Sequence, residues 1–186
     1  GGNDEFAFKT LSKWAGIYNE DITYYENSAS SGTVTAYVPK EENIEFVFVG
    51  QKYIDISQVD LVKAAIMEHG AVTTSYFDDD RFRADSEGEY YYRYEYVDLY
   101  GNRVETVDED AGTNHAVTLV GWNDKISKSD LTVTDSTGVT HTPQNDGAWL
   151  VKNSWGTWYG NEGYFWISYE DLGILSEYND AVVYEV

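Results

Sequence analysis

The sequence of 186 residues contains no cysteine. This absence excludes a disulfide framework, a thiolate metal site and a cysteine nucleophile within the chain itself. Long apolar runs are also missing: none approaches the roughly 18 residues that a membrane-spanning helix needs. We therefore expect no membrane span.

Basic residues are scarce. Lys and Arg together number 12 against 33 Asp and Glu, which gives a formal net charge of −21. Binding to nucleic acid requires a basic face that neutralises phosphates, and docking on anionic lipid has the same requirement. The composition therefore argues against nucleic acid as a partner. Hydrophobic residues make up 42% and aromatic residues 16% of the chain, which is typical of a folded domain rather than an acidic disordered segment.

Hydrophobic periodicity predicts an α+β protein with two helices and many strands. One helix is expected from Asn3 or Asp4 to Gly16, and a second from Ser57 to Gly70, with Ser57 and Asp60 as a capping box and Leu61 in its apolar stripe. The segment 123–147 is expected to be a long polar loop, with a short hairpin as the alternative. Strands are expected at 33–38, 44–49, 71–76, 90–96, 115–122, 148–153, 163–169 and 181–186, in an antiparallel sheet that closes on itself.

The chain has 3 histidines. His69 falls in the last turn of the second predicted helix, where its charge complements the helix dipole. His141 falls in the polar loop, where a solvated side chain is expected. His115 opens an apolar strand, which places its imidazole at a sheet edge. The strand alone supports a catalytic and a structural role for His115 equally.

A second cluster runs from Gly147 to Gly160 and is dense in Trp and Gly. Asn153 stands where the strand in this cluster ends. An amide oxygen at a strand end can accept a hydrogen bond from an imidazole N–H and fix the tautomer of the ring. The alternative is an asparagine that serves only in a turn.

Taken together, these motifs resemble the papain family of cysteine peptidases. The resemblance rests on Asn114-His115-Ala116-Val117, on Val151-Lys152-Asn153-Ser154-Trp155-Gly156, and on Gly163-Tyr164-Phe165. Gly1-Gly2-Asn3 and residues 62–76 resemble segments further upstream in the family. The likeness is greatest to bacterial surface-associated members, which implies a secreted or cell-surface location.

The resemblance implies a papain-like fold. Residues 1–26 would be a residual helical segment of the left-hand domain, and residues 27–186 a β-rich, barrel-like right-hand domain. The helix that carries the catalytic cysteine would be absent from this chain.

The resemblance also implies roles for individual residues. His115 would be the catalytic histidine, which forms a thiolate–imidazolium pair with a cysteine and protonates the leaving amine. Asn153 would orient His115, and Trp155 would shield their hydrogen bond from water. No cofactor and no metal is implied. Residues of the substrate cleft would be Asn114, Ala116, Ala71, Val72 and Tyr159, the last at a position where the family usually has a tryptophan.

The missing cysteine leaves three accounts open. The chain is the C-terminal piece of a processed two-chain peptidase, a fragment of a longer product, or an inactive relative that only binds. We expect a cysteine endopeptidase that acts through a thioester intermediate. Its partners would be an N-terminal peptidase segment carrying the cysteine and a peptide or protein substrate.

Other classes find weaker support in the sequence. A carbohydrate- or protein-binding module is the main alternative, with the tyrosines of 90–96 stacking on sugar rings or, otherwise, packing on a core with their hydroxyls in water. The acidic loops 78–80 and 108–110 do not match a calcium-binding EF-hand loop. Glycoside hydrolysis by paired carboxylates has no specific motif in its favour.

Overall fold

The computed structural model describes residues 4–12, 46–85, 87–98, 100, 102–105, 113–176 and 179–185. The chain forms two compact units, residues 1–52 with 184–186 and residues 53–183. The predicted boundary between residues 26 and 27 lies outside the described residues and stays a prediction. The predicted strand at 33–38 and the acidic loop 108–110 also lie outside them.

In the first unit, helix α1 spans Asp4–Leu11. Phe8 meets Phe48 edge-on, with ring centroids 5.7 Å apart, and Phe48 lies 6.2 Å from Tyr184. The predicted end of the helix at Gly16 lies outside the described residues. The predicted strand 44–49 is wrong in position, because the regular strand β1 spans Gly50–Asp55. It is an edge strand whose residues are exposed or half-buried, and it has few of the β-branched and aromatic residues on which the prediction depended.

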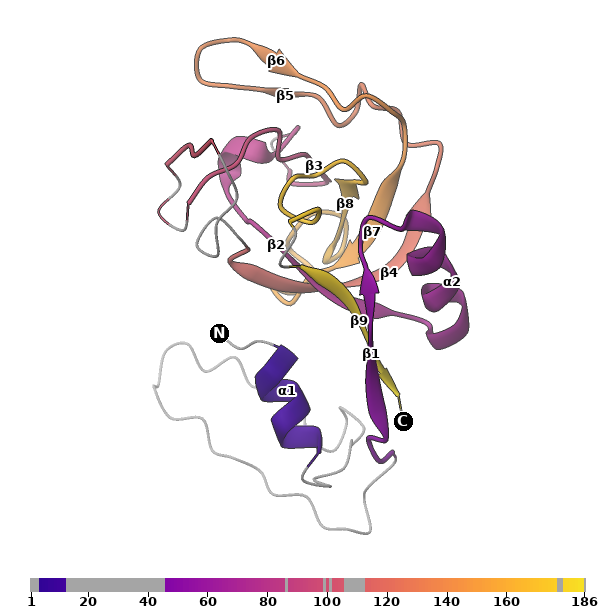
Figure 1. Ribbon diagram of the computed structural model, residues 1–186. Helices are drawn as coiled ribbons and strands as arrows, with labels where there is room; N and C mark the ends of the chain where they lie inside the picture. The colour runs from indigo at the N-terminus through magenta and orange to yellow at the C-terminus, as the bar shows by residue number, and fades with distance from the viewer. Residues whose placement is uncertain are drawn as a thin grey trace. The chain divides into compact units, whose positions relative to one another are not determined.

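Seven strands form one sheet in the order β1-β9-β2-β4-β7-β8-β3 (Figure 1). Neighbours β2 and β4, β4 and β7, and β7 and β8 are antiparallel, whereas β3 and β8 are parallel. Among the described residues the sheet stays open between β1 and β3, so the prediction of a closed barrel is wrong. The edge strand β3 is too short to continue the ladder. The strand bounds are β2 Val72–Tyr76, β3 Tyr90–Tyr91, β4 His115–Asn123, β7 Ala148–Lys152, β8 Tyr164–Ser168 and β9 Asp180–Glu185.

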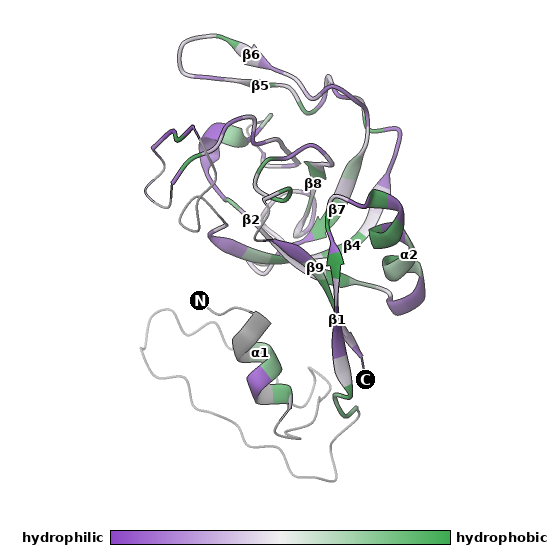
Figure 2. Cartoon of the chain, in the orientation of Figure 1, coloured by the Kyte–Doolittle hydropathy of each residue, from purple (hydrophilic) through white to green (hydrophobic). Residues whose placement is uncertain are grey.

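Helix α2 spans Val59–His69 and packs on β2 and β4 (Figure 2). As predicted, Gly70 ends it in a left-handed conformation at φ 83°, donating its N–H to the carbonyl of Ile66 at 2.8 Å. The predicted capping box is not formed. Instead, a carboxylate oxygen of Asp55 accepts from the backbone N–H of Ser57 at 2.9 Å and from its hydroxyl at 2.7 Å. Leu61 is 53% exposed and lies off the buried stripe.

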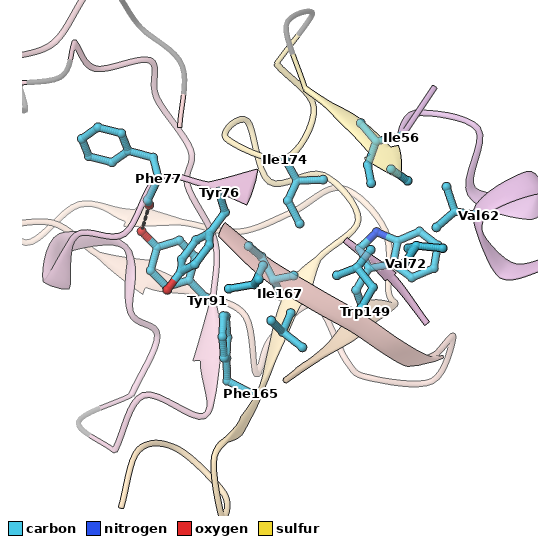
Figure 3. Close-up of a cluster of buried hydrophobic side chains, with 14 of the residues drawn as sticks. Ile56, Val62, Val72, Tyr76, Phe77, Tyr91, Trp149, Phe165, Ile167 and Ile174 are labelled. Atoms are coloured by element: carbon cyan, nitrogen blue, oxygen red, sulfur yellow. Dashed lines mark hydrogen bonds between the residues drawn. The ribbon is translucent and has the colours of Figure 1, made fainter. Parts of the chain in front are cut away.

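The core beside the end of β2 is aromatic. Tyr76 lies 5.1 Å from Tyr91 and 5.4 Å from Phe165 between ring centroids (Figure 3). The buried Tyr91 hydroxyl donates to the carbonyl of Phe77 and accepts from the backbone N–H of Asp79 at 3.0 Å. The core therefore fixes the segment that leaves β2.

The predicted strand 90–96 is mostly irregular. Only Tyr90–Tyr91 form strand β3, and within 90–96 the buried residues are Tyr91 and Arg93, whereas the other tyrosines are half-buried. Arg93 is tolerated inside because its polar groups are paired. Its backbone N–H donates to Asp171 at 2.6 Å, and its guanidinium donates to the carbonyls of Glu95 at 2.9 Å and Val97 at 3.1 Å.

The segment 123–147 contains the hairpin named as the alternative. Its strands are β5, Val133–Thr134, and β6, Thr140–His141. The prediction of a solvated His141 is wrong. The ring stacks on Tyr94 with centroids 3.6 Å apart, and Nε2 lies 3.0 Å from Oδ2 of Asp135. The hairpin brings Asp135 and His141 together, which the polar composition of the segment does not reveal.

Candidate active site

Strands β2, β4 and β7 bring the residues predicted from the sequence to one end of the sheet. His115, the first residue of β4, is paired with Tyr76, the last residue of β2. Strand β7 runs antiparallel to β4, with Thr118 opposite Lys152. Asn153, which follows β7 directly, therefore lies at the same end as His115.

His115 and Asn153 are in hydrogen-bond contact. Nε2 of His115 lies 2.8 Å from Oδ1 of Asn153. Asn153 is 8% exposed, and the same oxygen accepts the backbone N–H of Ser154 at 2.8 Å. Because an amide oxygen only accepts, the imidazole presents its N–H at Nε2. The neutral ring then has an unprotonated Nδ1, which is the arrangement of a general acid–base with one nitrogen fixed and one available.

Aromatic rings hold the imidazole on two sides. Trp155 stacks on His115 with centroids 4.5 Å apart and planes 26° from parallel. Tyr76 meets the ring nearly edge-on, 5.7 Å away at 71°. The stacked indole limits access of water to the His115–Asn153 bond and strengthens it by lowering the local dielectric.

Tyr159 lies behind Trp155 rather than on an exposed wall. It is 4% exposed and meets Trp155 edge-on at 4.8 Å, whereas the preceding Trp158 is exposed to solvent. Burial raises the pKa of Tyr159. The structure thus places Tyr159 against Trp155, and its role in the cleft stays a prediction.

Asn114 and Ala116 flank His115 and are exposed. The Asn114 side chain binds the backbone of Asp78 twice: its oxygen accepts the N–H at 2.6 Å, and its amide donates to the carbonyl at 3.0 Å. These two hydrogen bonds connect the segment after β2 to the start of β4. Asn114 therefore has a structural role beside the site.

The structure does not bring Ala71 and Val72 to this end of the sheet. Val72 is buried and pairs with Leu119, four ladder positions from the Tyr76–His115 pair. Ser75, which the sequence reasoning missed, is the residue of β2 opposite Ala116. The register between the two strands is the signal that identifies it, and a single sequence does not contain that register.

The acidic loop 78–80 directs its carboxylates to arginines. Asp79 pairs with Arg81 at 2.8 Å, and Asp80 pairs with Arg83 at 2.9 Å. Within the part of the chain that the structure describes, no group of three His, Asp or Glu side chains could hold a metal ion. In the same residues, no helix is long and apolar enough to cross a membrane.

Comparisons with known proteins identify relatives of the whole chain. The model of the papain family cysteine proteases matches residues 1–183. The structure of the cysteine protease and lectin-like domains of Cwp84, a surface layer associated protein of Clostridium difficile, is 30% identical with a TM-score of 0.66, covering 97% of this chain and 36% of that one. Cwp84 after propeptide cleavage gives 30% identity and a TM-score of 0.69, covering 100% and 42%.

Two further matches are a shorter alignment and a likeness of fold. A cysteine protease from Blomia tropicalis is 36% identical over 77 residues, which are 40% of this chain and 16% of that protein. Bromelain from Ananas comosus shares the fold at 20% identity and a TM-score of 0.54. The chain spans less than half the length of the Cwp84 structures. With a family model matched along nearly its whole length, the chain has a papain-like fold and belongs to the papain family of cysteine proteases.

Proposed function

We propose that this chain supplies the catalytic histidine and its orienting asparagine to a cysteine endopeptidase. The nucleophilic cysteine would be on an N-terminal segment or partner chain outside this sequence, which has no cysteine of its own. The observation that carries the proposal is the 2.8 Å contact between His115 Nε2 and Asn153 Oδ1, stacked against Trp155.

The proposed reaction uses both nitrogens of His115. Nδ1 takes the proton of the cysteine thiol, and the resulting thiolate attacks the carbonyl carbon of the peptide bond. As the C–N bond breaks, Nδ1 gives this proton to the leaving amine, and a thioester remains. His115 then takes a proton from the water that attacks the thioester, and returns it to the departing thiolate. Asn153 keeps the ring in one orientation throughout.

The proposed partners and location follow from the family and from one relative. Papain-family proteases act on peptide bonds, so the substrate would be a peptide or protein. The likeness to Cwp84, which is surface layer associated, supports a secreted or cell-surface location.

A peptidase assay of the assembled protein, with its N-terminal segment present, tests the proposal. His115→Ala should lower kcat/KM at least about 100-fold, the usual contribution of general acid–base catalysis. His69→Ala is the matched control, because His69 is an exposed residue at the end of α2. Activity in His115→Ala equal to that of the control would contradict the proposal. An inactive wild-type assembly would favour the binding role instead.

A further inference from the structure

We infer that Asp78 and Arg83, which form an ion pair, are positioning residues for His115. They act on the imidazole through the contacts of Tyr76, Tyr159 and Trp155, and their charges set the electric field at its ring. The inference rests on the proposed function for its catalytic meaning. It deepens that proposal by naming two groups that regulate the charge state of the histidine.

The contacts form a closed cycle of which the imidazole is one member, and Asp78 lies on one side of it. Tyr76 is fully buried and meets His115 edge-on at 5.7 Å. Its hydroxyl donates to Oδ1 of Asp78 at 3.1 Å. That carboxylate oxygen lies 3.7 Å from a terminal nitrogen of Arg83.

Arg83 continues this cycle of contacts on the other side of His115. Its guanidinium carbon lies 5.3 Å from the centroid of the Tyr159 ring. Tyr159 supports Trp155 at 4.8 Å, and Trp155 stacks on His115 at 4.5 Å. The ion pair therefore contacts Tyr76 directly and Trp155 through Tyr159, and these are the two aromatic residues that flank the imidazole.

Asp78 is fixed in place by its backbone. The side chain of Asn114, the residue before His115, binds both the N–H and the carbonyl of Asp78. The side chains of Asp78 and Arg83 are 23% and 25% exposed. Partly buried charges are screened less by salt than exposed charges, so their field reaches the neighbouring ring.

Other charged groups near His115 are already paired or are protonated. Asp79 binds Arg81 with both of its oxygens. Burial, reinforced by the charge of Asp78, raises the pKa of Tyr76 far above its ordinary value, so the hydroxyl stays a donor. The titratable and charged groups on the elements packed around His115 are Tyr76, Asp78, Asp79, Asp80, Arg81, Arg83, Tyr91, Lys152 and Tyr159.

The two partners should act on His115 in opposite directions. Without the negative charge of Asp78, the positive charge of Arg83 remains and disfavours a second positive charge on the imidazolium. Without Arg83, the carboxylate of Asp78 remains and favours the imidazolium. A purely structural role would not produce shifts of opposite sign.

An NMR titration of the His115 ring in the 186-residue chain tests the inference. Asp78→Asn should move the titration curve to lower pH and Arg83→Gln to higher pH. Asp78→Glu and Arg83→Lys keep the charges and should keep the curve near that of wild type. Asp80→Asn is the control: Asp80 also pairs with Arg83, but its side chain is 86% exposed and it should shift the curve much less.

Shifts in the same direction, or no shift in either variant, would overturn the inference. If Asp78→Asn does not fold, Arg83→Gln alone tests the inference, because the inference allows only a shift of the His115 titration curve to higher pH in that variant. The alkaline limb of the pH profile of kcat/KM in the assembled peptidase should move with the NMR curves. Opposite NMR shifts in the 186-residue chain, together with no peptidase activity in the protein assembled with its N-terminal segment, would uphold the inference and refute the proposed function.

Discussion

Replacing Asn153 by alanine removes the acceptor that orients His115. The contact is 2.8 Å long and lies beside the stacked indole of Trp155, with Asn153 itself buried. A hydrogen bond to a charged group contributes about 1.5–3 kcal/mol. Since about 1.4 kcal/mol corresponds to a factor of ten in rate, Asn153→Ala should lower kcat/KM about 10- to 150-fold.

Steady-state kinetics of the assembled peptidase measure this effect. Asn153→Asp keeps an acceptor oxygen at the same position and should recover part of the loss. Asn161→Ala, in the exposed turn that follows, is the matched control and should leave kcat/KM unchanged. The reasoning is refuted if Asn153→Ala folds and stays within twofold of wild type, because the imidazole would then need no orienting bond.

Two further predictions concern stability and titration. A Cβ at Gly147, where φ is +111°, would lie 2.5 Å from the Tyr169 ring, whereas at Gly138, with φ +88°, it would meet nothing within 4 Å. Gly147→Ala should therefore lower the free energy of unfolding in urea by about 2–5 kcal/mol and Gly138→Ala by about 1–2 kcal/mol, and equal losses would show that the Tyr169 contact is unimportant. Burial raises the pKa of Asp171 from 3.8 to about 6. Because the folded value is the higher one, its contribution to stability is fully present below about pH 4 and is lost as the pH rises through about 6, by roughly 3 kcal/mol; a carboxyl carbon NMR titration with a midpoint near 4 would contradict this.

The sequence predicted the strands that carry the site because their apolar residues are dense and continuous. Strands β4 and β7 begin at their predicted first residues, His115 and Ala148. The placement of His115 and Asn153 at one end of the sheet follows from those boundaries and an antiparallel pairing. Local pattern was enough here, because the apolar residues that are buried in each strand, such as Val117 and Leu119 in β4 and Trp149 and Val151 in β7, are the ones that mark it in the sequence.

The failures arose where tertiary contacts decide. Arg93 is buried because its backbone N–H donates to the distant Asp171 and its guanidinium to the carbonyls of Glu95 and Val97, an arrangement that the sequence pattern of 90–96 does not show. His141 finds Asp135 and Tyr94 only after the hairpin forms. The cleft position given to Val72 stays a prediction, and the register of β2 against β4, which places Val72 opposite Leu119, is not supplied by periodicity.

The most direct test of the central claim is the alkylation of the native peptidase by iodoacetamide near pH 6, followed by intact masses of all polypeptides. The proposed function predicts one rapidly alkylated cysteine, on a polypeptide segment outside this sequence, and loss of peptidase activity in step with the modification. It also predicts much slower alkylation in His115→Ala, because the thiolate loses its imidazolium partner. A native protein with no cysteine-bearing segment, or an alkylation rate unaffected by His115→Ala, would contradict the claim that this chain serves a cysteine nucleophile.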